Sequence, residues 1–298
     1  MVKPGMMQNK ISALAYGKIN LYLDVLSKME NGYHYIESVM QSVSLSDKIT
    51  LEVVDIEGEN QIEIKTACAV IPNDKGNLVY KTASAFLEKA NISGKHITFE
   101  IEKSIPISAG MAGGSSDGAT AMKLLNQYFG TPFSLDDLCT IGAKIGADIP
   151  FCLTGGTCIC RGIGEEITRL SPTREMLLVC AIDNSSVSTP VAFSMLDSKY
   201  GTSPLPYGKL DDMKNAIENG DIEGVSALLY NKFENVIIPE IPSISKIKKI
   251  LLENGAIGTL MSGSGPSVFG IFDNEKSQIK AYNALKNCSI RAFLCKTI

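Results

Sequence analysis

The chain has 298 residues, which is longer than a single hydrophobic core usually needs, so two domains are the first expectation. Hydrophobic residues make up 45% of the sequence and charged residues 20%, a balance that excludes an intrinsically disordered chain. The formal net charge is −4, with Lys and Arg scattered along the chain, which gives no basic face for nucleic acid or for an anionic membrane. A small-molecule substrate is therefore the expected partner.

The sequence contains eight cysteines but no Cys-x-x-Cys pair, and neither His34 nor His96 has a ligand-like neighbour. Free thiols, most of them buried, are therefore expected rather than disulfides or a metal site. Neither a signal peptide nor an apolar run long enough to span a bilayer is recognisable, so a cytoplasmic location is expected.

The first predicted elements are two strands, at residues 11–16 and 19–26, on either side of Gly17 and Lys18. Lys18 and Asn20 interrupt an otherwise apolar stretch. A buried lysine needs a carboxylate or a phosphate as partner, whereas an edge-strand lysine whose head reaches water needs none. The local sequence leaves both readings open.

A turn at Asn31-Gly32 is followed by Tyr33 and His34, which taken alone are typical of a structural lid on a small core. Residues 48–54 and 61–65 alternate as strands and are predicted to pair antiparallel across the loop at 57–59. Residues 77–90 have the apolar periodicity of a helix that ends before Ser93-Gly94.

The segment at residues 106–128 predicts a glycine loop that follows a strand (97–101) and opens a helix. Gly110, Gly113 and Gly114 allow positive φ and close approach, and Ser115 and Ser116 stand where the helix is expected to begin. The unpaired amides of a helix N-terminus hold phosphate well, so the segment indicates an anion site, although a plain turn is the alternative. The loop is neither a Walker A sequence nor a dinucleotide fingerprint, so the positive charge that phosphoryl transfer needs must come from elsewhere in the chain.

A capping box at Ser134 and Asp137 predicts a helix that runs to about residue 145, with Gly146 as its stop. Asp148 follows, between the helix end and an apolar run, and Pro150 fixes the backbone just beyond it. Asp148 is either a turn former, the commoner use of aspartate, or a rigidly held base.

The polar run at residues 171–175, which contains Pro172, predicts a domain boundary, giving domains at 1–170 and 171–298. Residues 176–182 form a buried strand, and Thr189-Pro190 reads as an N-cap followed by proline at the first helical position. Helices at 209–219, 221–230, 242–254 and 275–286 alternate with strands at 257–262, 268–273 and 290–295, an order that fits an antiparallel sheet with helices on one face. Residues 262–267 form a second glycine loop, a type of sequence most often found in linkers and hairpin turns.

A lysine in an apolar N-terminal region, a Gly-Gly-Ser-Ser loop that opens a helix, and a Ser-Gly-Ser-Gly loop near the C-terminus resemble, in this order, the GHMP small-molecule kinases. The resemblance covers nearly the whole chain through residues 15–21 (Ala-Tyr-Gly-Lys-Ile-Asn-Leu), 31–34 (Asn-Gly-Tyr-His), 109–116 (Ala-Gly-Met-Ala-Gly-Gly-Ser-Ser), 146–151 (Gly-Ala-Asp-Ile-Pro-Phe) and 261–269 (Met-Ser-Gly-Ser-Gly-Pro-Ser-Val-Phe). It implies an α+β, two-domain GHMP kinase fold, with an N-terminal ATP-binding domain like the second domain of ribosomal protein S5 and a ferredoxin-like C-terminal domain. The second and fourth segments resemble the branch that uses ATP to phosphorylate the 2-hydroxyl of an acceptor carrying a cytidine diphosphate group, in the non-mevalonate route to isoprenoids.

The same resemblance implies site residues. Asp148 would take the proton of the hydroxyl, while Lys18 would orient that hydroxyl and steady developing charge. Substrate contacts are implied at Asn20, Tyr33, His34, Thr189 and Phe193. ATP contacts are implied at Asn77, Leu78, Lys103, Pro106, Ile107, Ser108, Ala109, Gly110, Met111, Ala112, Gly113, Gly114, Ser115 and Ser116. Met111 stands where leucine is usual, and Gly118 where alanine is usual.

ATP is the implied phosphoryl donor, and Mg²⁺ is expected with it although no carboxylate is assigned to hold the ion. Two alternatives remain open. Another GHMP kinase, acting on homoserine, mevalonate or a sugar, would share the ATP loop but not the aromatic pair, Tyr33 and Phe193, which the resemblance implies for a cytosine ring. A catalytically silent nucleotide-binding regulator would keep the loop and lose the base, and the retained Lys18 and Asp148 count against it.

Overall fold

The computed structural model describes residues 10–171, 174–182, 185, 187–201 and 209–298. These residues form two compact units, and neither is a continuous piece of the chain. The first unit takes residues 10–15, 46–104 and 114–153, and the second takes 16–45, 105–113 and the described residues from 154 to 298. Strands β1 (Lys10–Lys28) and β2 (His34–Asp55) contribute to both units. The predicted boundary at 170/171 falls inside the second unit and stays a prediction, and Pro172 lies outside the described residues.

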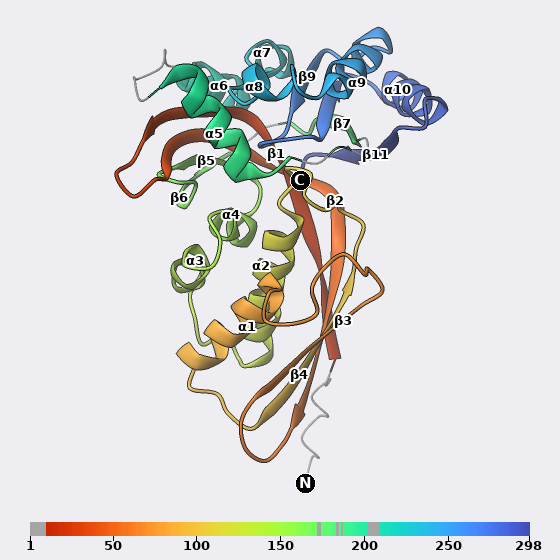
Figure 1. Cartoon of the computed structure of the whole chain (residues 1–298). Helices are drawn as coiled ribbons and strands as arrows, with labels where there is room; N and C mark the ends of the chain where they lie inside the picture. The colour runs from red at the N-terminus through yellow and green to blue at the C-terminus, as the bar shows by residue number, and fades with distance from the viewer. Residues whose placement is uncertain (1–9, 172–173, 183–184, 186, 202–208) are drawn as a thin grey trace. The chain divides into compact units, whose positions relative to one another are not determined.

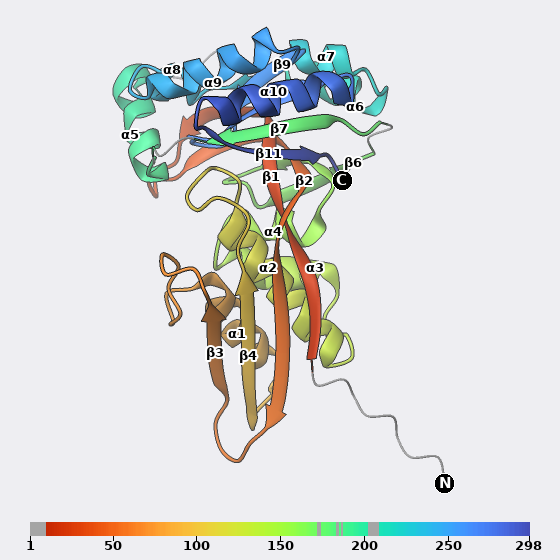
Figure 2. The same cartoon turned by 90° about the vertical axis from the view of Figure 1, so that its right-hand side faces the viewer.

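In the first unit, β4 (Lys95–Glu102) lies between β2 and β3 (Gln61–Thr66), as Figure 2 shows. It pairs antiparallel with β2 from Lys48↔Glu102 onward and parallel with β3 from Gln61↔His96 onward. The predicted pairing of residues 48–54 with residues 61–65 is therefore wrong. Helix α1 (Leu78–Lys89) connects β3 to β4, and a strand that follows such a crossover returns parallel to the first and lies beside it.

Helices α1, α2 (Gly113–Tyr128), α3 (Leu135–Ala143) and α4 (Ile149–Thr154) supply the rest of this unit (Figure 1). Alternate residues of β2 and β4, among them Leu51 and Phe99, share a buried cluster with Phe86 of α1 and Met122 of α2. The predicted capping box at Ser134 is confirmed, because its side chain accepts from the Asp137 amide and the Asp137 side chain accepts from the Ser134 amide.

The second unit contains a four-stranded antiparallel sheet in the order β11 (Arg291–Lys296), β7 (Leu177–Ile182), β10 (Val268–Phe272), β9 (Gly258–Met261). Val179 and Ala181 of β7 pack in one cluster with residues of α9 (Pro242–Glu253) and α10 (Glu275–Asn287). Leu178 and Cys180 pack in another, which includes residues of α6 (Leu210–Glu218) and α7 (Ile222–Ala227). The predicted antiparallel sheet is confirmed. The prediction that helices lie on one face alone is not, because residues of α6 and α7 share the buried cluster of Leu178 and Cys180.

The remaining elements of this unit are α5 (Thr189–Tyr200), α8 (Glu234–Ile237) and strands β5 (Thr157–Arg161), β6 (Glu166–Leu170) and β8 (Tyr230–Asn231). Strand β5 pairs antiparallel with β2, and the two-residue β8 pairs parallel with β1. The two strands predicted at 11–16 and 19–26 are one continuous strand, because Gly17 and Lys18 continue β1 without a turn. Sequence periodicity did not predict β6, β8 or α8, which are short.

All eight cysteines are free thiols; Cys158, Cys160, Cys180 and Cys295 are buried, and Cys288 is exposed. Within the described part of the chain, no helix is both long and apolar enough to cross a membrane. The same residues form no cluster of three or more His, Cys, Asp or Glu side chains that could hold a metal ion.

Candidate active site

Residues 106–112, the first part of the predicted phosphate loop at 106–116, carry unusual backbone conformations. Gly110 has φ +74°, and the non-glycine residues Ser108 and Ala112 have φ +52° and +54°. Positive φ is uncommon for residues with a side chain, and such conformations cluster at ligand sites. The structure corrects the expectation for Gly113 and Gly114, which do not have positive φ but form the first residues of α2.

The second glycine loop, residues 262–267, holds the phosphate loop by its backbone. Ser262 Oγ donates a hydrogen bond of 2.9 Å to the Gly110 carbonyl, and Ser267 Oγ donates to the Ala109 carbonyl. A Cβ atom at Gly110 would lie 2.1 Å from the Ser262 carbonyl oxygen, so no side chain fits there. This loop is therefore no simple linker, because it packs against a segment more than 150 residues earlier in the chain.

Lys18 lies beside both loops in the second unit. Its side chain is buried, and a Cβ atom built on Gly263 would lie 3.4 Å from Lys18 Nζ. The ammonium donates to Asn20 Oδ1 at 2.8 Å, and Asn20 Nδ2 donates to Ser38 Oγ at 2.8 Å. No carboxylate of the described residues forms an ion pair with Lys18, so its charge is left for another anion.

Asp148 belongs to the first unit, where it directly precedes α4 and its carbonyl accepts from the Cys152 amide at 3.0 Å. The side chain is half-buried. None of the residues that the structure describes hydrogen-bonds to its carboxylate, which leaves both oxygens available to a ligand. The predicted pairing of Lys18 with Asp148 stays a prediction.

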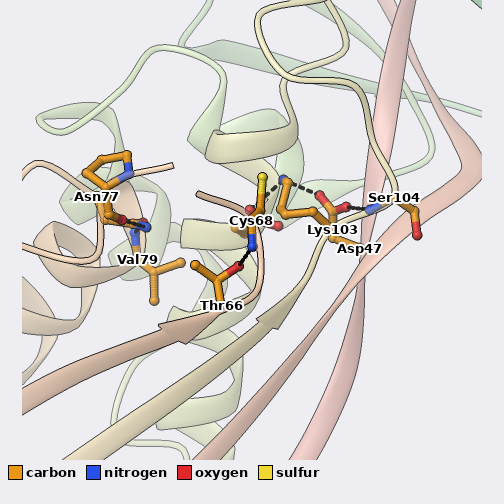
Figure 3. A network of polar contacts seen from close by, with 9 residues as sticks. Asp47, Thr66, Cys68, Asn77, Val79, Lys103 and Ser104 are labelled. Carbon is orange, nitrogen blue, oxygen red and sulfur yellow. Dashed lines mark hydrogen bonds and ion pairs between the residues drawn. The ribbon is translucent and has the colours of Figure 1, made fainter. Parts of the chain in front are cut away.

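Asn77 and Leu78 lie at the start of α1 in the first unit. Asn77 is the N-cap: its Oδ1 accepts from the Val79 amide at 2.9 Å and its Nδ2 donates to the Pro72 carbonyl at 2.7 Å (Figure 3). Leu78 Cδ1 would lie 3.5 Å from a Cβ atom on Gly114, so this side chain packs beside the first turn of α2. The predicted ATP contacts at Leu78 and Gly114 are thus neighbours.

Lys103 has two carboxylate partners, Asp47 and Asp117, and all three residues belong to the first unit (Figure 3). Lys103 Nζ lies 2.8 Å from Asp117 Oδ2 and also donates to Asp47 Oδ2, while the Ser104 amide donates to Asp47 Oδ1 at 2.5 Å. The Lys103 ammonium therefore neutralises two buried acids, a structural role that its sequence motif did not indicate.

The charges of this cluster shift the pKa values of its members. Burial raises the pKa of Asp117 to about 7, the Asp47 carboxylate acts in the same direction, and Lys103 opposes both. Burial lowers the pKa of Lys103, but the two carboxylates outweigh it and the pKa is raised. Asp117 Oδ1 is buried without a hydrogen-bond partner among the described residues, which fits a carboxyl group that binds a proton readily.

The predicted cytidine-binding residues lie in the second unit, where His34 stacks on Phe193 with ring centroids 4.6 Å apart and an angle of 15° between the rings. His34 Nε2 lies 2.7 Å from Asp197 Oδ1, and Asp197 Oδ2 lies 2.5 Å from Lys28 Nζ. Burial raises the pKa of Asp197, but its hydrogen bonds with Lys28 and His34 outweigh this and lower it. Tyr33 is 59% exposed and is open to a ligand.

Thr189 was expected to be an N-cap, which is wrong. Ser188 is the N-cap of α5, and Thr189 is its first helical residue. The Thr189 hydroxyl lies 2.9 Å from Ser264 Oγ, so it joins α5 to the second glycine loop instead. The sequence alone did not predict this contact between residues 75 positions apart.

The second unit thus brings together one group of the predicted residues, and the first unit holds the others. In the second unit lie Lys18, Asn20, Tyr33, His34, the loop from Pro106 through Ile107 to Gly113, Thr189 and Phe193. In the first unit lie Asn77, Leu78, Lys103, Gly114, Ser115, Ser116 and Asp148. Four polar residues of these units were not predicted from the sequence: Asp47, Asp117, Asp197 and Asn231. The only sequence feature that marks them is that each is a polar residue within an apolar or helical run.

The two departures from the family pattern are accommodated locally. Met111 is buried, and its carbonyl accepts from the Lys18 amide at 3.1 Å. Gly118 lies within α2, where a Cβ atom would be 3.1 Å from Thr82 Cγ2 of α1. Glycine at this position therefore suits the close packing of the two helices.

The first turn of α2 fits the phosphates of ATP. It begins with Gly113 and Gly114, which carry no side chains, and Gly114 is exposed. The amides of such a turn have no partner within the helix and lie at the positive end of its dipole. Since the described residues form no acidic cage, a magnesium ion here would be held mainly by phosphate and water, as Mg²⁺ often is.

Comparison with known proteins agrees with this geometry. The family model of the GHMP kinases N terminal domain matches residues 77–156, and that of the GHMP kinases C terminal domain matches residues 213–290. A Caldicellulosiruptor bescii protein named 4-diphosphocytidyl-2-C-methyl-D-erythritol kinase is 42% identical over 91% of this chain and 93% of its own. A Clostridium botulinum protein of the same name is 40% identical over 95% of this chain and 99% of its own.

Solved structures give the same result. A crystal structure of 4-(cytidine 5'-diphospho)-2C-methyl-D-erythritol kinase superposes with a TM-score of 0.80 at 26% identity, covering 96% of this chain and 99% of that one. Homoserine kinase from Cytophaga hutchinsonii shares the fold with a TM-score of 0.77 at 18% identity, covering 100% of this chain and 97% of that one. By fold, by both domain models and by identity over nearly its whole length, the chain belongs to the GHMP kinases and, within them, to the family of the 4-diphosphocytidyl-2-C-methyl-D-erythritol kinases.

Proposed function

We propose that this protein transfers the γ-phosphoryl group of ATP to the 2-hydroxyl of 4-diphosphocytidyl-2-C-methyl-D-erythritol, a step of the non-mevalonate route to isoprenoids. Relatives that are 40–42% identical over more than nine-tenths of the chain carry the name of this kinase. The geometry of the second unit supports the same chemistry through the position of Lys18.

The observation that carries the proposal is the buried ammonium of Lys18 beside two glycine loops. A buried cation without an anionic partner costs several kcal/mol, so a protein that keeps one has a use for it. The two neighbouring glycine loops are held together by the hydrogen bond from Ser262 to Gly110, and the described residues offer Lys18 only the neutral Asn20 amide. A phosphorylated substrate would supply the missing negative charge.

The residues divide the work of phosphoryl transfer as follows. The amides of residues 113–116 bind the phosphates, and Lys18 stabilises the charge on the transferring group and orients the acceptor hydroxyl. The hydroxyl oxygen forms a bond to the γ-phosphorus while the bond from that phosphorus to the β,γ-bridging oxygen breaks. Asp148 accepts the hydroxyl proton, and ADP leaves with the bridging oxygen. Mg²⁺ neutralises phosphate charge when it is bound with ATP.

The ring cluster of the second unit supplies specificity for the acceptor. His34 and Phe193 form a preassembled aromatic surface, held on one side by Phe233 at a centroid distance of 5.0 Å. Tyr33, which precedes His34 in the chain, adds an exposed ring to this pair. A cytosine base stacks well on such side chains, and Thr189 and Asn20 offer polar groups to the rest of the acceptor.

An ATP-turnover assay over a panel of acceptor alcohols tests the proposal. The panel contains the cytidine-diphosphate-bearing acceptor, the same polyol without cytidine diphosphate, homoserine and mevalonate. We expect ADP to form only with the first. Equal or better turnover of homoserine or mevalonate would identify another GHMP kinase, and ATP binding without turnover of any acceptor would identify a regulator.

A further inference from the structure

Asn231 is a buried amide in the two-residue strand β8, and every polar atom of its side chain is used. Its Nδ2 donates to the carbonyls of Met261 at 2.7 Å and Gly263 at 2.8 Å, and its Oδ1 accepts from the Phe233 amide at 3.0 Å. The side chain lies 4% exposed. Two donors and one acceptor of a single amide are thus satisfied by backbone groups on two segments.

The two carbonyls that Asn231 holds lie on either side of Ser262. This serine is the residue whose hydroxyl donates to the Gly110 carbonyl, and its own carbonyl lies against Gly110 too closely for any side chain. Gly263, whose carbonyl Asn231 binds, lies beside Lys18 Nζ. The position of the peptide between Ser262 and Gly263 therefore fixes contacts with both the phosphate loop and the catalytic lysine.

Glu234, three residues after Asn231, also binds the backbone of the second glycine loop's first strand end, at Met261. Glu234 Oε1 accepts from the Met261 amide at 2.9 Å, and Lys248 Nζ lies 2.6 Å from the same oxygen. Strand β8 also pairs with β1, with Leu23 opposite Asn231. Strand β1 carries Lys18 and Asn20, so residues 230–234 link the lysine-bearing strand to the glycine loop that surrounds the lysine.

We propose that Asn231 is a positioning residue for phosphoryl transfer, acting through the backbone of Ser262 and Gly263 on the phosphate loop and on Lys18. The proposal rests on the kinase function proposed above. Asn231 contacts neither reacting atom, and its effect is geometric: a displacement of about 1 Å at a reacting group costs on the order of 100-fold in rate.

The test compares Asn231→Ser and Asn231→Leu with the matched variant Asn126→Leu. Asn126 is also a buried asparagine whose side-chain amide is satisfied by the backbone. Its Nδ2 donates to the Phe133 carbonyl at 2.9 Å, and its Oδ1 accepts from the Phe133 amide at 3.1 Å. It lies near the far end of α2 and touches neither glycine loop. All three variants are expected to melt at a lower temperature than the wild type.

The kinetic readout separates positioning from stability. We expect Asn231→Leu to lower kcat about 10- to 100-fold, with the KM for the cytidine-bearing acceptor unchanged, whereas Asn126→Leu keeps the wild-type kcat at a temperature where it is folded. Asn231→Ser keeps one hydroxyl donor and should fall between Asn231→Leu and the wild type. Wild-type kcat in both Asn231 variants would overturn the proposal.

Hydrogen–deuterium exchange of peptides covering residues 105–113 gives a readout that needs no activity. Asn231→Ser should speed exchange in this segment, and Asn126→Leu should not. If the wild type turns over no acceptor while Asn231→Ser still loosens the loop, the kinase proposal fails and the positioning of the loop stands. Unchanged exchange at residues 105–113 in Asn231→Ser refutes the positioning role itself.

Discussion

The Lys103 ammonium lies 2.8 Å from Asp117 Oδ2, with both side chains nearly buried, and it also forms an ion pair with the buried Asp47. Asp117 therefore has to share the Lys103 cation with a second buried carboxylate. It lies in the first turns of α2, directly after Ser115 and Ser116 of the predicted phosphate site.

The pH dependence of stability follows from the raised pKa of Asp117. Its pKa in the folded protein, about 7, exceeds the ordinary value of 3.8, so the folded state binds the proton more tightly than the unfolded state does. The stabilising contribution is complete below about pH 4 and is lost as the pH rises through 7. Asp117→Asn should therefore gain stability relative to the wild type as the pH rises from 5 to 8, by about 2–3 kcal/mol, because about two units of the pKa difference lie above pH 5. Urea unfolding of both proteins at pH 5 and at pH 8 measures this difference in the free energy of unfolding.

Asp137→Asn is the contrasting control for that experiment. The hydrogen bonds from Ser134 lower the pKa of Asp137, so its contribution is present above the ordinary pKa and is lost as the pH falls. If Asp117→Asn and the wild type keep a constant difference in stability from pH 5 to pH 8, the Asp117 carboxyl carries no proton in this range.

Lys103→Met should destabilise the first unit, because it leaves the Asp47 and Asp117 carboxylates buried without their cation. Removing one partner of a buried ion pair typically costs about 3–5 kcal/mol. Lys48→Met is the control, since Lys48 forms an exposed ion pair with Glu102 and should change stability little. Thermal unfolding distinguishes the two. A raised KM for ATP in Lys103→Met, with stability unchanged, would favour a direct contact with adenine over the structural role.

Gly110→Ala should disrupt the phosphate loop. Its Cβ atom would lie 2.1 Å from the Ser262 carbonyl oxygen, and the residue has φ +74°, so both packing and backbone oppose a side chain. We expect a loss of about 100-fold in kcat/KM for ATP. Gly130→Ala is the control: Gly130 also has a positive φ, of +80°, but nothing lies within 4 Å of its Cβ position. Near wild-type ATP kinetics in Gly110→Ala would show that the two loops separate during turnover.

Asp148→Asn should retain the fold and ATP binding but lose turnover, because an amide cannot accept the hydroxyl proton. Loss of a general base commonly costs about 10²–10⁴-fold in kcat. Asp136→Asn, which changes an exposed carboxylate in the first turn of α3, should leave kcat unchanged. Steady-state kinetics at saturating substrates measure kcat, and calorimetry measures ATP binding. If Asp148→Asn keeps the wild-type kcat, Asp148 is a turn former and not the general base.

Tyr33→Ala should weaken binding of the cytidine-bearing acceptor about 5- to 150-fold, since loss of one aromatic stacking partner costs about 1–3 kcal/mol. The exposed position of Tyr33 keeps this variant free of the packing loss expected for Phe193→Ala, because Phe193 contacts both His34 and Phe233. The KM for ATP should not change. Tyr35→Ala, also on the exposed side, is the control. Equal effects of the two variants on both substrates would argue against a base-stacking role for Tyr33.

Short-range patterns predicted much of the fold correctly. The helix expected at 77–90 is α1, and the capping box at Ser134 and the strands at 257–262 and 268–273 are where the sequence placed them. Each of these depends on residues within a few positions of one another, such as an N-cap and the amide two or three residues on. The glycine loop that opens α2 was recognisable for the same reason.

Long-range contacts decided the rest. Strand β3 pairs with β4 instead of β2, and Ser262 reaches Gly110 across 152 positions of sequence. Whether Lys18 was an edge residue or a buried cation depended on strands and loops far from it in the chain. The sequence by itself therefore determined the local elements and the chemistry available to them. The tertiary structure decided which polar groups satisfy one another, because burial forces each buried donor and acceptor to find a partner wherever the chain brings one.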